Sequence, residues 1–140
     1  MEDSPLRKFA PLHMLIVEDD SILADIAGDH YRDDIGFSVD QAGDGKQALQ
    51  LMDIRRPDIV LCDRLMPEMS GSELLETVRA RGPEWQQMVF VFVTGLNDRR
   101  DRYAMMPLSP DAYFCKPIDF NQADVKLAAI LTARQAERDF

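Results

Sequence analysis

The chain has 140 residues, of which 46% are hydrophobic, and this suits one globular domain with a buried core and leaves no room for a second. Its formal net charge of −9 argues against nucleic acid as a direct partner, because phosphate contacts need a basic face. No stretch is apolar enough to cross a bilayer, and residues 1–12 lack a signal-peptide core, so we expect a cytoplasmic protein that does not bind membranes.

Strand patterns alternate with helix patterns along the first half of the chain. Residues 1–12 mix charge and proline, so the sequence predicts a loose, flexible leader there. It then predicts, in order, a strand His13 to Val17, a helix from Asp20 or Ser21 to about Tyr31, a strand Phe37 to Gln41, and a helix capped by Asp44. The first of these helices carries apolar residues at helical spacing: Ile22, Leu23, Ile26 and Ala27.

The second half continues the alternation. It predicts a strand Ile59 to Cys62, a helix Glu73 to Arg81 opened by Ser70 or Ser72, a strand Val89 to Val93, a helix Arg99 to Met106, a strand Ala112 to Cys115, and an amphipathic helix capped by Asp119. Pro107 and Pro110 cut the fourth helix short. The final helix turns Ala123, Leu127, Ile130 and Leu131 inward. We expect the domain to span residues 13–136, followed by a short tail, 137–140.

Five strands that alternate with five helices predict an α/β fold, a doubly wound five-stranded parallel sheet with helices on both faces. Right-handed crossovers leave few strand orders, and the common order 2-1-3-4-5 places the first and third strands side by side. Cys62 and Cys115 each fall inside a strand expected to be buried, where a reduced thiol behaves as a small apolar side chain.

Polar side chains stand where the strands end. Asp63 follows the third strand, Glu18 and Asp19 follow the first, Thr94 follows the fourth and Lys116 the fifth. In a parallel sheet these ends share one edge, so one site would gather carboxylates, a hydroxyl and an ammonium group. The alternative is that Asp63 merely begins a loop and the acidic residues form a solvated rim. The arrival of Thr94 and Lys116 at the same edge argues against that alternative.

The three carboxylates need a cation. At about 4 Å and an effective dielectric constant near 20, each like-charged pair costs on the order of 4 kcal/mol. Oxygen ligands with no histidine or thiolate nearby suit Mg²⁺, or Mn²⁺. A lysine, a hydroxyl and a cation that face a carboxylate form an anion site beside a nucleophile.

The order and spacing of these motifs resemble the receiver domain of two-component response regulators, of the stand-alone, chemotaxis-regulator-like type with flavodoxin-like topology. The resemblance spans roughly His13 to Arg134. It rests on four motifs: Val17-Glu18-Asp19, Asp63 with Met66-Pro67 and Gly71, Val93-Thr94-Gly95, and Tyr113-Phe114-Cys115-Lys116-Pro117.

The resemblance implies that Asp63 accepts a phosphoryl group from a histidine kinase or a histidine phosphotransfer protein, and so switches a protein-interaction surface. It implies a Mg²⁺ shell of Glu18, Asp19, Asp63 and the backbone carbonyl of Leu65. Lys116 and Thr94 would contact the phosphoryl group, and Tyr113 would turn inward when Thr94 moves. The chain would be a signalling domain with only self-phosphorylation and self-dephosphorylation chemistry, and a monomer or a phosphorylation-dependent dimer.

Other readings stay open. The chain could be a receiver excised from a longer regulator with an output domain. A flavodoxin-like electron carrier would need a phosphate-binding loop after the first strand, where this chain has Glu18-Asp19-Asp20-Ser21. A phosphohydrolase with an aspartyl nucleophile would want a second carboxylate two residues after Asp63, where this chain has Leu65. The segment Met105 to Pro110 departs from the receiver pattern, so the output face should differ from that of better-known relatives.

Overall fold

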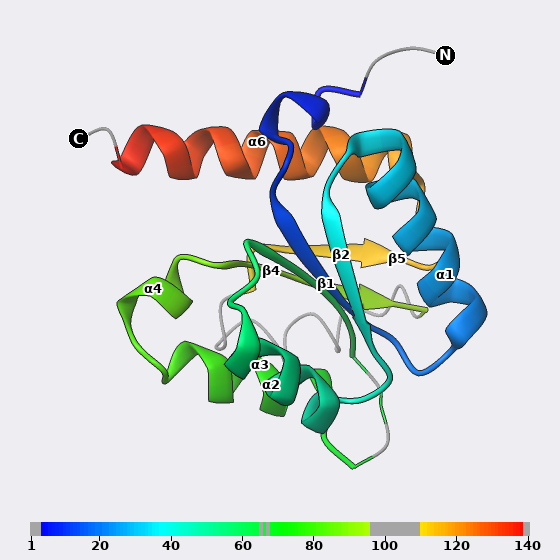
Figure 1. Cartoon of the computed structure of the whole chain (residues 1–140), viewed down its shortest axis with the longest axis vertical. Coiled ribbons are helices and arrows are strands. Elements are labelled where there is room, and N and C mark those ends of the chain that lie inside the picture. The colour runs from blue at the N-terminus through cyan, green and yellow to red at the C-terminus, as the bar shows by residue number, and fades with distance from the viewer. Residues whose placement is uncertain (1–3, 65, 67, 96–109, 139–140) are drawn as a thin grey trace.

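The fold is a parallel sheet between two layers of helices (Figure 1). The computed structural model describes residues 4–64, 66, 68–95 and 110–138. Its strands are β1 (His13–Val17), β2 (Ser38–Ala42), β3 (Ile59–Asp63), β4 (Val89–Thr94) and β5 (Ala112–Cys115). The described residues form a five-stranded sheet in the order β2-β1-β3-β4-β5, with every pairing parallel. The predicted fold class and strand order are therefore confirmed.

The helices begin where capping side chains precede them. They are η1 (Arg7–Phe9), α1 (Ser21–Asp29), the π-helix η2 (His30–Ile35), α2 (Gly45–Ile54), α3 (Gly71–Arg79), α4 (Pro83–Gln86) and α6 (Phe120–Arg138). Asp20, Asp44, Ser70 and Asp119 each accept hydrogen bonds from main-chain N–H groups of the first helical turn, as predicted. The predicted helix Arg99 to Met106 lies outside the described residues. No helix described here is long and apolar enough to span a membrane.

Two apolar cores lie on opposite faces of the sheet. Helices α1 and α6 cover one face, and α2 and α3 cover the other (Figure 1). Strand β3 contributes Ile59 and Leu61 to the first core and Val60 and Cys62 to the second, because successive side chains of a strand point to opposite faces. The short run of apolar residues is thus buried on both sides, and only its end reaches solvent.

Of the four apolar residues noted at helical spacing on α1, Ala27 is buried and the three larger ones are exposed. Ile22, Leu23 and Ile26 are 71%, 37% and 51% exposed, and the buried side chains of this helix are Ala24 and Ala27. A Cβ atom on Gly28 would lie 2.6 Å from the side-chain nitrogen of Gln41, so the Gln41 side chain of β2 packs against this helix at the glycine. The small residues take the sheet side, and the larger apolar residues are left in solvent.

Three smaller expectations also differ. Strand β2 begins at Ser38 rather than at Phe37, whose N–H instead bonds the Tyr31 carbonyl and closes the π-helix. Cys62 is buried, but Cys115 is exposed because it is the last residue of the edge strand β5. On α6, Ile130 is only partly buried.

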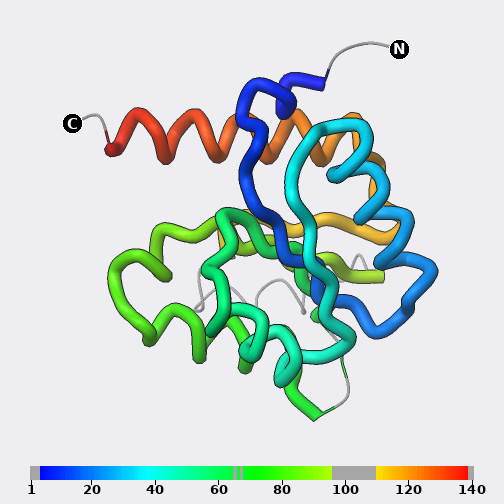
Figure 2. Tube along the Cα trace, in the orientation of Figure 1, coloured from blue at the N-terminus to red at the C-terminus, as the bar shows by residue number. Residues whose placement is uncertain are grey.

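The segment before β1 packs on the domain over residues 4–12, which differs from the loose leader expected there. Leu6 is fully buried in the core beneath α1 and α6. Arg7 donates a hydrogen bond of 2.7 Å from Nε to the main-chain carbonyl of Asp34. The trace in Figure 2 shows this segment beside α6, far from it in sequence. An apolar anchor and a polar one therefore hold the start of the described chain in place.

Candidate functional site

Three carboxylates meet at the carboxyl edge of the sheet. Glu18 and Asp19 directly follow β1, and Asp63 is the last residue of the neighbouring strand β3. One carboxylate oxygen from each of the three lies within 4.8 Å of the others. Glu18 and Asp63 are both only 8% exposed, whereas Asp19 is exposed. The juxtaposition predicted from the strand ends is therefore present.

Lys116 supplies a cation to this cluster. Its N–H bonds the Thr94 carbonyl at 2.8 Å, which fixes the residue at the end of β5 beside β4. Its Nζ lies 3.0 and 3.1 Å from the two carboxylate oxygens of Glu18 and 3.1 Å from Oδ2 of Asp63. One ammonium group thus bridges two nearly buried carboxylates.

The surroundings shift the protonation of these groups. Burial, together with the neighbouring Asp63 charge, raises the pKa of Glu18 to about 7, although Lys116 acts in the opposite direction. Burial alone would lower the pKa of Lys116, but its hydrogen bonds to Glu18 and Asp63 raise that pKa instead. Lys116 therefore stays an ammonium group, and the cluster has more negative charge than one lysine can balance.

Gly71 lets the chain close tightly behind Asp63. The Gly71 N–H bonds the Arg64 carbonyl at 3.0 Å, and Ser70 caps α3 at the same turn. A Cβ atom on Gly71 would lie 2.6 Å from the main-chain oxygen of Asp63 and 2.9 Å from the ring of Phe92. Close packing against the Asp63 backbone is the reason for a glycine at this position.

The two remaining predicted residues lie on β4 and β5. Thr94 is buried at the end of β4, at the same edge as Asp63. Tyr113 is half-buried on β5, where its ring stacks on Phe92 at a centroid distance of 6.1 Å. Leu65, whose carbonyl was expected to complete a metal shell, lies outside the described residues.

A crevice of about 120 Å³ opens beside the charged cluster. Glu18, Asp63 and Lys116 line it together with apolar side chains of α1 and of the segment after β5: Leu23, Ile26, Ile118 and Phe120. The sequence pattern noted the helical spacing of Ile22, Leu23 and Ile26 but did not predict that this helix forms a wall of the site. The site is therefore polar at its base and apolar at its side.

In this sheet a lysine that follows the fifth strand bridges carboxylates at the ends of the first and third strands. This arrangement is typical of a receiver domain of two-component signalling. The chain belongs to the response regulator receiver domain family, whose family model matches residues 14–128.

Curated relatives share the domain over most of this chain. It is 32% identical over 126 residues to the sensory transduction protein RegX3 of Mycolicibacterium smegmatis, which covers 90% of this chain and 53% of RegX3. It is 30% identical over 121 residues to TcrX of Mycobacterium tuberculosis, covering 86% and 50% of the two chains. The chain therefore spans about half the length of these relatives.

Solved structures share the fold. A signal receiver domain of a signal transduction histidine kinase from Syntrophus aciditrophicus is 27% identical and superimposes with a TM-score of 0.72, covering 90% of this chain and 91% of that one. The receiver domain of the Francisella response regulator 1452 is 20% identical, with a TM-score of 0.74 and coverage of 87% and 98%. The second similarity concerns the fold alone.

Proposed function

We propose that this domain accepts a phosphoryl group on Asp63 from a phosphohistidine of a histidine kinase or a histidine phosphotransfer protein. The observation that supports this most directly is the position of Lys116 Nζ, 3.1 Å from the Asp63 carboxylate, beside two further acidic residues. A carboxylate oxygen of Asp63 forms the new P–O bond while the P–N bond of the phosphohistidine breaks. The leaving imidazole keeps the electron pair of that bond.

The donor set fits Mg²⁺, with Mn²⁺ as a substitute. Glu18, Asp19 and Asp63 offer only carboxylate oxygens, and these lie close enough together to share one ion. The backbone carbonyl of Leu65 is the fourth protein ligand in this proposal. When bound, the ion neutralises charge on the acidic residues and on the phosphoryl oxygens.

Lys116 and Thr94 act on the phosphoryl group once it is attached. Lys116 already lies beside Asp63 and can pair with a phosphoryl oxygen, and the Thr94 hydroxyl at the same edge can donate to another. The modification adds about 1.5 to 2 negative charges at a site that is almost buried. Movement of Thr94 and then Tyr113 would change the outer surface, which is a switch between two states rather than turnover of a substrate. We place this switch in the cytoplasm.

The donor approaches over α1. Asp63 lines the crevice together with Ile26 of α1, and Ile22 and Ile26 expose apolar surface on the same helix. A helix that carries the phosphohistidine could bury these apolar groups while its imidazole reaches Asp63. Exposed apolar side chains grouped beside a reactive carboxylate suit a protein donor better than a small molecule.

The experiment is intact mass spectrometry after incubation with Mg²⁺ and acetyl phosphate. We expect the wild type to gain one phosphoryl group and Asp63→Asn to gain none. Asp53→Asn, at an exposed position on α2, is the matched control and should behave as wild type. Equal labelling of Asp63→Asn and wild type would refute the assignment. Omission of Mg²⁺ tests the cation separately.

A further inference from the structure

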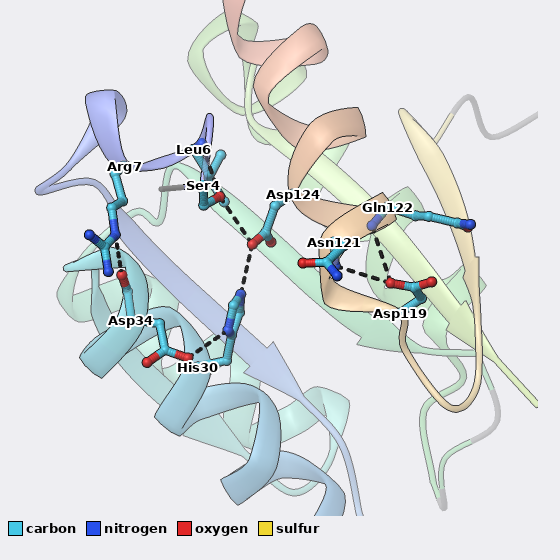
Figure 3. A network of polar contacts seen from close by, with 9 residues as sticks. All are labelled: Ser4, Leu6, Arg7, His30, Asp34, Asp119, Asn121, Gln122 and Asp124. Atoms are coloured by element: carbon cyan, nitrogen blue, oxygen red, sulfur yellow. Dashed lines mark hydrogen bonds and ion pairs between the residues drawn. The ribbon is translucent and has the colours of Figure 1, made fainter. Parts of the chain in front are cut away.

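A second cluster of ionisable groups lies between the end of α1 and the start of α6, away from the phosphoryl site (Figure 3). Its centre is His30, the first residue of the π-helix. The ring donates from Nε2 to Oδ2 of Asp124, on α6, at 2.7 Å, and from Nδ1 to Oδ2 of Asp34 at 3.0 Å. The cluster therefore joins residues 94 positions apart in sequence.

Both ring nitrogens of His30 face carboxylates, and this geometry suits only the charged ring. A neutral imidazole carries one N–H and could donate to one carboxylate, whereas an imidazolium donates to both. Asp124 is 3% exposed, so it needs a partner more than Asp34, which is half exposed. Burial alone would lower the pKa of His30, but Asp124 and then Asp34 raise it above its ordinary value of 6.5.

The other groups around His30 belong to three elements. Ser4, before η1, donates its hydroxyl to Oδ2 of Asp124 at 3.2 Å. Phe120, the first residue of α6, stacks on the His30 ring with centroids 4.3 Å apart. Tyr31 lies beside the ring, and Arg7 bonds the main chain of Asp34. Asp34, Asp124, Tyr31 and Arg7 are thus the ionisable groups that surround the ring.

His30 is the cation that is hydrogen-bonded to Asp124 among the described residues, and the Ser4 hydroxyl is a neutral donor to the same oxygen. The Tyr31 hydroxyl lies close enough to Asp124 to interact with that carboxylate. Burial and the Asp124 charge both raise the pKa of Tyr31, so this neighbour stays neutral. When the His30 ring loses its proton, Asp124 loses the cation that is hydrogen-bonded to it.

We propose that His30 is a pH-dependent clamp that holds the first turns of α6 and residues 4–6 against the end of α1. At acidic to neutral pH the charged ring ties the three segments together through Asp124 and Asp34. At alkaline pH the ring is neutral, the buried carboxylate is left without its cation, and the start of α6 opens more often. Phe120 both stacks on His30 and lines the crevice at Asp63, so this opening would reach the edge of the phosphoryl site.

The direction of the pH dependence follows from the linkage between protonation of His30 and folding. His30 has a higher pKa in the folded chain than in the unfolded chain, so its contribution is complete below about pH 6.5 and is lost as the pH rises through the folded-state pKa. Glu18 also changes protonation near neutral pH. Because Glu18 is the same in wild type and in a His30 variant, its contribution cancels when the two are compared.

The first test is an NMR titration of the histidine rings. The chain has two histidines, so the signal absent from His30→Gln identifies His30. We expect this ring to titrate above pH 6.5. Asp124→Asn should lower its midpoint more than Asp34→Asn, because the buried carboxylate is less screened by solvent. A midpoint at or below 6.5 in the wild type would overturn the proposal without any variant having to fold.

The second test compares urea unfolding of wild type and His30→Gln between about pH 5.5 and 8.5, a range that brackets the ordinary histidine pKa. The unfolding constant of His30→Gln divided by that of the wild type should fall as the pH rises. The total fall should be about tenfold for each unit by which folding raises the His30 pKa. Hydrogen exchange should show the same trend at the amides of the first turns of α6. A ratio that stays constant with pH would mean that His30 only fills space, and would overturn the clamp.

Discussion

At the scale of single residues, the absence of a Cβ atom at Gly71 is expected to matter for the stability of the domain. We expect Gly71→Ala to lower the free energy of unfolding by about 1–3 kcal/mol, because the new methyl group meets the Asp63 main chain and the Phe92 ring. The same displacement should slow phosphoryl uptake from acetyl phosphate. Gly43→Ala is the control, since its added Cβ would make an ordinary contact of 3.5 Å with Gln47. Equal stability of the two variants in urea would contradict this view of the turn.

Lys116 is expected to stabilise the domain when no divalent ion is present. Lys116→Met removes the ammonium group between Glu18 and Asp63 and should cost about 1–3 kcal/mol in urea unfolding with a chelator present. Addition of Mg²⁺ should recover part of this loss, because the ion supplies positive charge to the same carboxylates. Lys126→Met, at an exposed position on α6, should show neither effect. A variant that is destabilised equally with and without Mg²⁺ would argue against an ion at this cluster.

The residues of the phosphoryl site could be predicted because the ends of parallel strands share one edge. Glu18, Asp63 and Lys116 each follow a short apolar run, so topology alone brings them together. His30 and Asp124 could not be paired in this way, because their contact depends on which faces two helices turn toward each other. A signal was present, however: Asp124 falls on the apolar stripe of α6 between Ala123 and Leu127.

At the scale of elements, α1 shows why periodicity does not identify the buried face by itself. Ile22 and Ile26 have the spacing of a core stripe, and so do the smaller Ala24 and Ala27. The structure buries the smaller pair against the sheet and leaves the larger pair exposed. The prediction of a loose segment over residues 1–12 was wrong for residues 4–12 for a related reason. Leu6 is a single buried residue, and no periodic pattern of apolar residues around it indicated its burial.

Asp111 joins several elements and is a second strong determinant of stability. It accepts hydrogen bonds from the Phe90 N–H at 2.8 Å and from Arg79 of α3 at 3.1 Å, and it pairs with Arg134 of α6. Asp111→Ala should lower the free energy of unfolding by about 2–4 kcal/mol, because two partly buried guanidinium groups lose their counter-ion.

The control for Asp111 is Asp29→Ala, which removes a solvent-exposed pair with Arg32 at 3.5 Å. Such a pair contributes less than about 1 kcal/mol. Thermal or urea unfolding of both variants gives the comparison. If Asp111→Ala unfolds no more easily than Asp29→Ala, the three-element junction does not stabilise the domain.

At the scale of the whole molecule, the acidic cluster lies at the edge of the sheet, and the proposed donor surface lies beside it on α1. Ile22→Ser should leave labelling by acetyl phosphate unchanged, because Ile22 is 71% exposed and does not line the crevice at Asp63. It should slow transfer from the phosphorylated cognate histidine kinase by about tenfold, since apolar contact area is lost. Ile54→Ser, on α2 at the opposite face and 83% exposed, should alter neither rate. Equal transfer rates for all three proteins would exclude α1 as the docking face.

The layers, the strand order and most element bounds followed from alternating patterns, because few connections of right-handed crossovers are possible in a parallel sheet. The strands matched to within one residue at either end. The sequence patterns could not predict contacts that depend on how closely two elements pack in space. The exposed face of α1, the anchored segment before β1 and the His30 cluster are all of this kind.

The burial of Leu6 has a practical consequence for protein engineering. The family match covers residues 14–128, and a fragment trimmed to those limits would lose both Leu6 and Leu131, two side chains of the core. It would also lose the Ser4 hydroxyl that bonds Asp124. The packed core of this chain therefore extends beyond the residues that the family model matches. Fusion partners and affinity tags are better joined before Ser4 and after Arg138, where they leave this packing intact.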